Sequence, residues 1–197
     1  MRICLLRHGQ TDWNKQGKIQ GREDIPLNNA GIEQIKKAAE YIKKLNWEII
    51  VASPLSRAKM SAQILSKELK NLEILYDINL IERDYGEASG KTKAERASLF
   101  PDGKWNGMEP FDQLQRRTIN ALTKYTNEYN EGNIIIVAHG EAIRSILTYI
   151  SDTETGTEEI VWQPGKNAHI SYLEKTDDKY KIIFYNKTVD ELEISQT

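Results

Sequence analysis

Residues 2–6 have the sequence R-I-C-L-L, and two later segments share its short, apolar character: E-I-I-V-A at 48–52 and I-I-I-V-A at 134–138. Short runs rich in Ile, Val and Leu are typical of strands that are buried on both faces of a sheet. Weaker strand candidates lie at residues 72–76, 169–174 and 180–185. The last two are typical of a late hairpin, because a polar turn separates them.

Helical periodicity fills the intervals between these strands. Apolar residues recur at three- and four-residue steps within 29–45, 55–69 and 111–129, and a shorter helix is expected at 141–150. For the helix at 55–69, Ser53 is the expected N-cap and Pro54 the expected first helical residue. The alternation of strands and helices predicts an α/β fold class: a three-layer α/β/α sandwich with a mostly parallel central sheet.

Glycines and prolines interrupt residues 86–110, at Gly86, Gly90, Pro101, Gly103, Gly107 and Pro110. We expect this segment, with part of the helix that follows it, to be a small irregular cap over one edge. The length of 197 residues fits a single domain over 1–197. The tail after Lys187 is acidic and polar, and it is expected to fray.

Composition narrows the possible classes of protein. A net charge of −2 gives no support for a general nucleic-acid or membrane-surface binder. The one cysteine, Cys4, lies in an apolar run and is expected to be a buried hydrophobic residue rather than a nucleophile. No signal peptide and no apolar run of transmembrane length are visible, so we expect a cytoplasmic protein.

Three polar residues follow the strongest strand candidates. His8 comes just after 2–6, His139 comes just after 134–138, and Arg57 lies in the first helical turn after 48–52. Ligands of open α/β sheets bind in the crevice outside the carboxyl ends of the strands, so these side chains are expected to meet there. With Arg7 they would form a site of imidazoles and guanidinium groups, which is suited to a phosphate. A neutral imidazole in such a site can attack phosphorus, while the cations stabilise the transferring oxygens.

Five ordered segments resemble the histidine phosphatase superfamily, which includes the phosphoglycerate mutases. They are L-L-R-H-G-Q-T-D-W-N at 5–14, Q-G-R-E-D-I-P-L-N-N-A-G at 20–31, S-P-L-S-R-A at 53–58, I-E-R-D-Y-G-E-A-S-G at 81–90 and V-A-H-G at 137–140. The resemblance extends over roughly residues 1–185 and implies a phosphoglycerate mutase-like fold.

The resemblance also implies roles for individual residues. His8 would be the nucleophile, and Glu82 would protonate the leaving oxygen and then activate water. The phosphoryl oxygens would be held by Arg7, Arg57 and His139. The remaining pocket residues would be Asn14, Gln20 and Gly21, with Gly9 and Gly140 allowing close backbone approach. Neither a metal nor another cofactor is expected, because the arginines supply the positive charge and Asp12 and Glu23 belong to no ligand cluster.

Several assignments have competitors. Asp84 and Glu87 are the nearest alternatives to Glu82, although each is more typical of a surface charge. His169 is expected to be structural, with the alternative that it reaches the rim of the pocket. Most of the basic residues in 91–117 are expected on a solvated helical face, with the alternative that one or two bind a second anionic group: Lys91, Lys93, Arg96, Lys104, Arg116 and Arg117.

We weigh three functions. The favoured one is a phosphomonoesterase acting on a small phosphorylated metabolite and releasing inorganic phosphate. A phosphoglycerate mutase is the second, favoured by E-R-D-Y-G at 82–86 but disfavoured by the short segment that follows. A non-catalytic phosphate-binding protein is the third, since fold alone does not determine function. The sequence leaves the substrate and the oligomeric state open.

Overall fold

The structure, a computed structural model, describes residues 1–153 and 167–194. Within these ranges the strands are β1 (Arg2–Arg7), β2 (Ile49–Ala52), β3 (Ile74–Tyr76), β4 (Ile134–Ala138), β5 (Ile170–Thr176) and β6 (Lys179–Lys187). They form one sheet in the order β3-β2-β4-β1-β5-β6. Each of the predicted strands, including the weaker candidate at 72–76, is therefore confirmed within a few residues.

Parallel pairing brings three strand ends to one place. β1 pairs with β4 so that Arg7 lies opposite Ala138, and β4 pairs with β2 so that Val137 lies opposite Ala52. The residues that follow these three strands therefore leave the sheet at the same edge. β5 and β6 extend the other side of the sheet in antiparallel pairing, as the hairpin pattern predicted.

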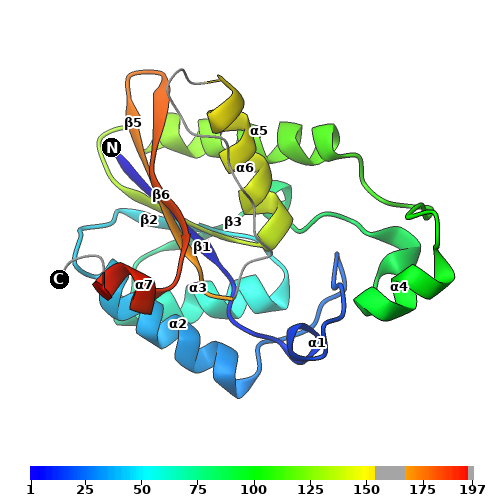
Figure 1. Cartoon of the computed structure of the whole chain (residues 1–197). Coiled ribbons are helices and arrows are strands. Elements are labelled where there is room, and N and C mark those ends of the chain that lie inside the picture. The colour runs from blue at the N-terminus through cyan, green and yellow to red at the C-terminus, as the bar shows by residue number, and fades with distance from the viewer. Residues whose placement is uncertain (154–166, 195–197) are drawn as a thin grey trace.

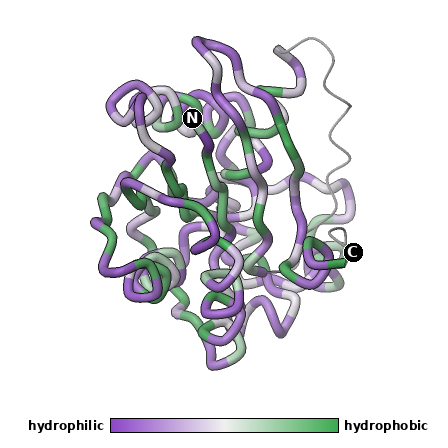
Figure 2. Tube along the Cα trace, turned by 90° about the vertical axis from the view of Figure 1, so that its left-hand side faces the viewer, coloured by the Kyte–Doolittle hydropathy of each residue, from purple (hydrophilic) through white to green (hydrophobic). Residues whose placement is uncertain are grey.

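Helices cover both faces of the sheet, which confirms the predicted three-layer α/β fold (Figure 1). One face carries α2 (Asn29–Ile42), α3 (Ser56–Glu68) and α7 (Val189–Ile194), and the other carries α5 (Phe111–Glu128) and α6 (Gly140–Thr153). Successive strand residues point to opposite faces. Cys4 and Leu6 accordingly pack in the core under α2 and α3, while Ile3 and Leu5 pack under α5 and α6. Figure 2 shows hydrophobic segments along the strands in the middle of the molecule.

The segment between β3 and α5 contains more regular structure than the glycines and prolines suggested. It holds a short α-helix and two 3-10 turns: η1 (Ile78–Leu80), η2 (Gly86–Ala88) and α4 (Lys93–Leu99). α4 lies to one side of the sheet in Figure 1, on the same side as α1 (Asp12–Lys15). The expectation of a wholly irregular cap is thus wrong over 93–99, where Thr92 and Glu95 form a capping box.

Two further expectations are wrong. α3 begins at Ser56 with Leu55 as its N-cap, because the Ser53 hydroxyl is used elsewhere, accepting from Leu55 N and contacting His139. The tail after Lys187 does not fray over residues 189–194. It forms α7, and Val189 and Leu192 are buried in the core cluster under α2. No helix in the ranges given above is long and apolar enough to span a bilayer.

Candidate active site

The ends of β1, β2 and β4 place the two predicted histidines side by side. The His8 backbone N–H donates to Ala138 O at 3.0 Å, which continues the β1–β4 pairing for one residue beyond the strands. The His8 and His139 rings then lie 5.2 Å apart between centroids, tilted by 59°. Arg57 joins them from the first turn of α3, and all three side chains are buried.

His8 and Arg57 border a pocket of about 230 Å³. Its lining contains eight residues that the sequence predicted: Arg7, His8, Asn14, Gln20, Gly21, Arg57, Glu82 and Gly140. His139 does not line the pocket but lies directly against His8. The parallel sheet therefore gathers the predicted residues in one crevice.

The tautomer of His8 follows from its neighbour. His8 Nδ1 lies 2.7 Å from Gly9 O, and because a carbonyl can only accept, Nδ1 carries the hydrogen. Nε2 of the neutral ring then carries the lone pair. Burial lowers the pKa of His8 well below its ordinary value, and the charges of Arg57 and Arg7 lower it further. His8 is thus a neutral imidazole, protonated at Nδ1 only, in a cationic pocket.

The loop after β1 is held from several directions. Gly9 N donates to Ser61 Oγ of α3 at 3.2 Å, and Asn167 Nδ2 donates to both His8 O and Gly9 O at 3.3 Å. A Cβ at Gly9 would stand 2.3 Å from Gly31 O, so only glycine allows this loop to approach α2. The close approach predicted for Gly9 is therefore one to the protein's own backbone. At Gly140, by contrast, an added Cβ would make an ordinary contact, 3.5 Å from Arg7 Cζ.

Arg57 connects the pocket to the loop that follows Gln20. Its Nη1 donates to Glu23 O at 2.6 Å, its Nη2 donates to Gly21 O at 2.7 Å, and its Nε–H has no acceptor among the described residues. Burial lowers the pKa of Arg57 to about 10, so the guanidinium remains charged at neutral pH. It therefore keeps its Nε–H uncommitted while it fixes the loop.

His139 has a similar arrangement. Its Nε2 lies 2.7 Å from Ser53 Oγ, and its buried Nδ1 has no partner among the described residues. Burial, Arg57 and His8 lower its pKa well below the ordinary value.

Glu82 enters the pocket from the segment between η1 and η2. Its Oε1 accepts from Arg83 N at 3.0 Å and, at the N-terminus of α6, from Glu141 N and Ala142 N at 3.2 Å each. Burial raises the pKa of this carboxyl above its ordinary value, and Glu141 adds to the rise. The Arg83 N–H and the charges of Arg57 and Arg7 oppose it. A carboxyl with a raised pKa is suited to carrying a proton.

Asn14 and Gln20 are tied to each other through Thr11. Thr11 Oγ1 lies 2.8 Å from Gln20 Oε1 and 3.1 Å from Asn14 Oδ1, and Asn14 Oδ1 also accepts from Asn167 Nδ2 at 3.0 Å. The amide oxygens of both residues are therefore engaged with the protein.

The competing residues lie outside the pocket lining. Asp84 accepts from Gly86 N and pairs with Arg22, and Glu87 accepts from Asn106. His169 Nδ1 contacts Asn186 Oδ1. None of the six basic residues of 91–117 lines the pocket, and Arg117 does not belong to a solvated face: its side chain is only 15% exposed.

Sequence reasoning missed several residues of the site. Four more side chains line the pocket: Lys18, Ile19, Tyr85 and Glu141. Tyr85 lies inside the family-like segment 81–90, and Glu141 directly follows the segment 137–140, so sequence position alone is a usable signal for both. Ser53, Ser61 and Asn167 act through contacts between residues distant in sequence, which no local pattern encodes. Within the described ranges, no three His, Cys, Asp or Glu residues are grouped so as to hold a metal ion.

Paired imidazoles and guanidinium groups at the strand ends of an α/β sheet, with a buried carboxyl beside them, are suited to binding and transferring a phosphoryl group. The chain belongs to the histidine phosphatase superfamily (branch 1), whose family model matches residues 3–188. It is 42% identical over 186 residues to "Uncharacterized phosphatase PhoE" of Bacillus subtilis, an alignment covering 93% of each protein.

The chain is also similar to a mutase and to a solved phosphatase structure. The chain is 30% identical over 187 residues to a "2,3-bisphosphoglycerate-dependent phosphoglycerate mutase" of Thermoplasma acidophilum, covering 88% of each. A mycobacterial glucosyl-3-phosphoglycerate phosphatase solved with VO3 shares the fold, with a TM-score of 0.84 at 24% identity, covering 95% of this chain and 99% of that one. The relatives are thus phosphatases and mutase-like enzymes.

Proposed function

We propose that this protein hydrolyses small phosphomonoesters through a phosphohistidine formed on His8. The observation that carries the proposal is the state of His8. Its Nδ1–H is committed to Gly9 O, so the ring presents a nitrogen lone pair at Nε2 in a pocket that also holds Arg7 and Arg57. Two buried nitrogens, Arg57 Nε and His139 Nδ1, have no hydrogen-bond partner among the described residues, and they would donate to the phosphoryl oxygens of a bound substrate.

In the first step, His8 Nε2 forms a bond to phosphorus while the bond from phosphorus to the ester oxygen breaks. The leaving oxygen takes the proton of the Glu82 carboxyl and departs as an alcohol. Such general acid catalysis contributes typically about 10²–10⁴-fold for a poor leaving group. The guanidinium groups stabilise the charge on the phosphoryl oxygens throughout.

In the second step, water attacks phosphorus and gives its proton to the Glu82 carboxylate, while the bond between phosphorus and Nε2 breaks. Inorganic phosphate leaves, and His8 and Glu82 return to their starting protonation states. One carboxyl therefore acts as acid and then as base, which a raised pKa favours.

A mutase on the same site is the second candidate. The relative from Thermoplasma matches over nearly its whole length, so chain length does not argue against a mutase as strongly as the sequence suggested. Two observations still favour hydrolysis. The relative at 42% identity carries a phosphatase name, and the only α-helix between β3 and α5 in the described chain is the seven-residue α4, a small shield for phosphohistidine against water.

The test is phosphate release from p-nitrophenyl phosphate and a panel of small metabolite phosphates at mildly acidic pH. His8→Ala is expected to lower turnover by at least about 10³-fold, as the loss of a nucleophile does. Chemical quenching early in turnover should trap an acid-labile phosphoenzyme in the wild type and none in His8→Ala. His169→Gln, which changes a histidine outside the pocket lining, is the matched control.

Other outcomes would identify the alternatives. Wild-type turnover by His8→Ala would contradict the proposal. Phosphate binding without turnover on any ester would indicate a binding protein. If a monophosphoglycerate supplied with 2,3-bisphosphoglycerate is isomerised faster than phosphate is released, the protein is a mutase.

A further inference from the structure

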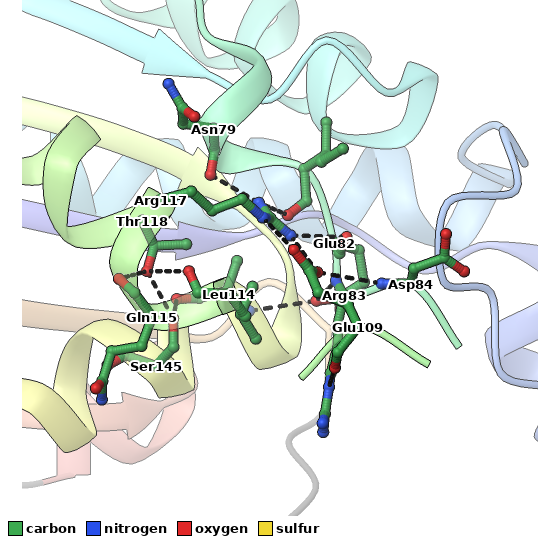
Figure 3. Close-up of polar contacts among 12 residues, drawn as sticks. Asn79, Glu82, Arg83, Asp84, Glu109, Leu114, Gln115, Arg117, Thr118 and Ser145 are labelled. Atoms are coloured by element: carbon green, nitrogen blue, oxygen red, sulfur yellow. Dashed lines mark hydrogen bonds and ion pairs between the residues drawn. The ribbon is translucent and has the colours of Figure 1, made fainter. Parts of the chain in front are cut away.

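Arg117 occupies an unusual position for an arginine on a helix that borders solvent. Its side chain is 15% exposed, whereas that of its neighbour Arg116 is 75% exposed. All of its N–H groups point toward acceptors: Nη1 donates to Asn79 O and Ile81 O at 2.7 Å each, and Nη2 donates to Glu82 O at 3.1 Å (Figure 3). Nε and Nη2 also form a bidentate pair with the Glu109 carboxylate, at 2.8 and 2.9 Å.

Asn79 lies in η1, but the other two acceptors, Ile81 and Glu82, lie in a segment without regular secondary structure. Residues 81–84 lie between η1 and η2 and belong to no strand or helix. Backbone carbonyls away from water need donors, which a sheet or helix would normally supply. Here one guanidinium supplies them for three carbonyls around Glu82, with the added strength of a charged donor.

Glu109 completes the arrangement. Its carboxylate also pairs with Arg22, the residue that follows the pocket residue Gly21, at 3.3 Å. Its backbone N–H donates to Asp84 O at 2.9 Å. We refer to Arg117 and Glu109 together as the clasp. The clasp therefore connects α5, the Glu82 segment and the loop that Arg57 holds from the other side.

Glu82 is consequently fixed at both ends by different helices. Its carbonyl is held by Arg117 of α5, and its carboxylate by the N-terminal N–H groups of α6. The two helices are locked to each other close by, where Thr118 Oγ1 and Ser145 Oγ lie 2.8 Å apart (Figure 3). A shift of the segment against α6 would move the carboxyl relative to His8.

We propose that Arg117, through the clasp, is the positioning residue for the Glu82 carboxyl, and that it sets how well the enzyme protonates poor leaving groups. This inference rests on the proposed function, in which Glu82 is the acid. Arg117 does not line the pocket, so it acts through the placement of Glu82 and not by contact with substrate.

The test compares two substrates that differ in their need for a proton. An alkyl phosphate such as glycerol phosphate needs an acid, whereas p-nitrophenolate leaves without one. The readout is kcat/KM, which reports the formation of phosphohistidine and not its hydrolysis, a step common to both esters. For Arg117→Gln we expect kcat/KM on the alkyl ester to fall about 30- to 100-fold and kcat/KM on p-nitrophenyl phosphate to fall less than about threefold. Arg116→Gln, one residue away on the exposed side of α5, should match the wild type on both substrates.

Two further variants separate positioning from general destabilisation. Arg117→Lys keeps the charge, but one ammonium cannot replace the planar fork on three carbonyls and a carboxylate. We expect a selective loss of about tenfold on the alkyl ester from this variant, with its thermal unfolding confirming that it folds. If Arg117→Gln does not fold, Arg117→Lys and Glu109→Gln carry the test. In the background of Glu82→Gln, a change at Arg117 should cost the alkyl ester nothing more, because residues that act as a unit are not additive.

The outcomes are distinguishable. Equal losses on both substrates from a folded Arg117 variant, together with a selective loss from Glu82→Gln, would overturn the clasp proposal and leave the proposed mechanism intact. Equal losses on both substrates from Glu82→Gln itself would instead remove Glu82 as the acid, and the clasp proposal with it.

Discussion

The two halves of the pocket are built in different ways. His8, Arg57 and His139 follow directly on β1, β2 and β4, so the sheet register determines where they lie. Glu82 lies on a segment without regular structure and is held by the Arg117 side chain of α5 and by the N-terminus of α6. The half that we propose to bind phosphate is thus attached directly to the sheet core, and the half that we propose to transfer the proton depends on a few specific contacts.

The two halves should therefore be open to separate perturbation. A change in the Glu82 segment should leave phosphate affinity unchanged, because this segment belongs to no strand and does not position His8, Arg57 or His139. A change at the strand ends should weaken phosphate binding whatever the leaving group. Substitutions at Glu82, Arg57 and Gly86 test this separation.

Glu82→Gln should remove one limb of the pH profile. In the wild type, kcat/KM for an alkyl phosphate should fall toward low pH as His8 takes a proton, below its ordinary pKa of about 6.5 because the pKa is lowered. It should fall toward high pH as Glu82 loses its proton, above its ordinary value because that pKa is raised. Glu82→Gln should lower the alkyl ester rate by about 10²–10⁴-fold and abolish the high-pH limb.

Phosphate affinity is the control for this variant. Inhibition by inorganic phosphate should stay within about threefold of the wild type, because the charged donors at the strand ends are intact. A large loss of phosphate affinity, or a persisting high-pH limb, would break the separation between the two halves.

Arg57→Ala should weaken phosphate binding without discriminating between leaving groups. Its guanidinium supplies charge-assisted hydrogen bonds, so its removal should raise the inhibition constant of phosphate about 100-fold. Rates on alkyl and p-nitrophenyl esters should fall together. Lys59→Ala, an exposed lysine on the same helix, is the matched control. Unchanged phosphate affinity in Arg57→Ala would place the anion elsewhere.

Gly86→Ala should destabilise the cap without touching the phosphate half. Gly86 has φ +49, and a Cβ there would stand 2.1 Å from Asn106 O, where residues 84–87 pair with 106–109. We expect the free energy of unfolding to fall by about 2–3 kcal/mol. Gly103→Ala is the control, since Gly103 has φ +71 with nothing within 4 Å of the added Cβ; it should lose only about 1 kcal/mol.

Urea unfolding measures both glycine variants. Equal losses would mean that the close approach of 84–87 to 106–109 carries no stability. A loss of phosphate affinity in a folded Gly86→Ala protein would show that the cap supports the strand-end half as well.

The same contrast explains what the sequence could predict. The strand ends were predictable because Ile-rich runs mark buried parallel strands, and the side chains after them converge by topology. The histidine phosphatase segments then singled out Glu82, whose placement between two helices no periodicity would predict. The individual roles of the site residues stay predictions, as does the single-domain assignment.

The short helices were missed although the chain carries a signal for them. Thr92 and Glu95 cap α4, and Thr188 and Glu191 form the same reciprocal contacts before α7. A Thr followed three residues later by Glu is a helix-start pattern that does not depend on apolar periodicity. Weighting it above glycine and proline content would have located both helices.

Arg117 was beyond reach for a different reason. An arginine beside another arginine on an amphipathic helix is usually solvated, and the backbone carbonyls that accept from Arg117 lie 35 to 38 positions earlier in the chain. Only the packing of η1 against α5 in the folded protein shows that the α5 face carrying Arg117 is covered. Local charge patterns cannot distinguish the two cases.

Cys4 gives the molecule a built-in reporter of its own opening. It is the single cysteine of the chain, it has no exposed surface, and burial raises the pKa of its thiol well above the ordinary value. It also lies on β1, four residues before His8. A thiol reagent can therefore react only when β1 is uncovered, either from its neighbouring strands or from the helices packed over Cys4. The labelling rate thus measures how often the strand that carries His8 becomes exposed to solvent.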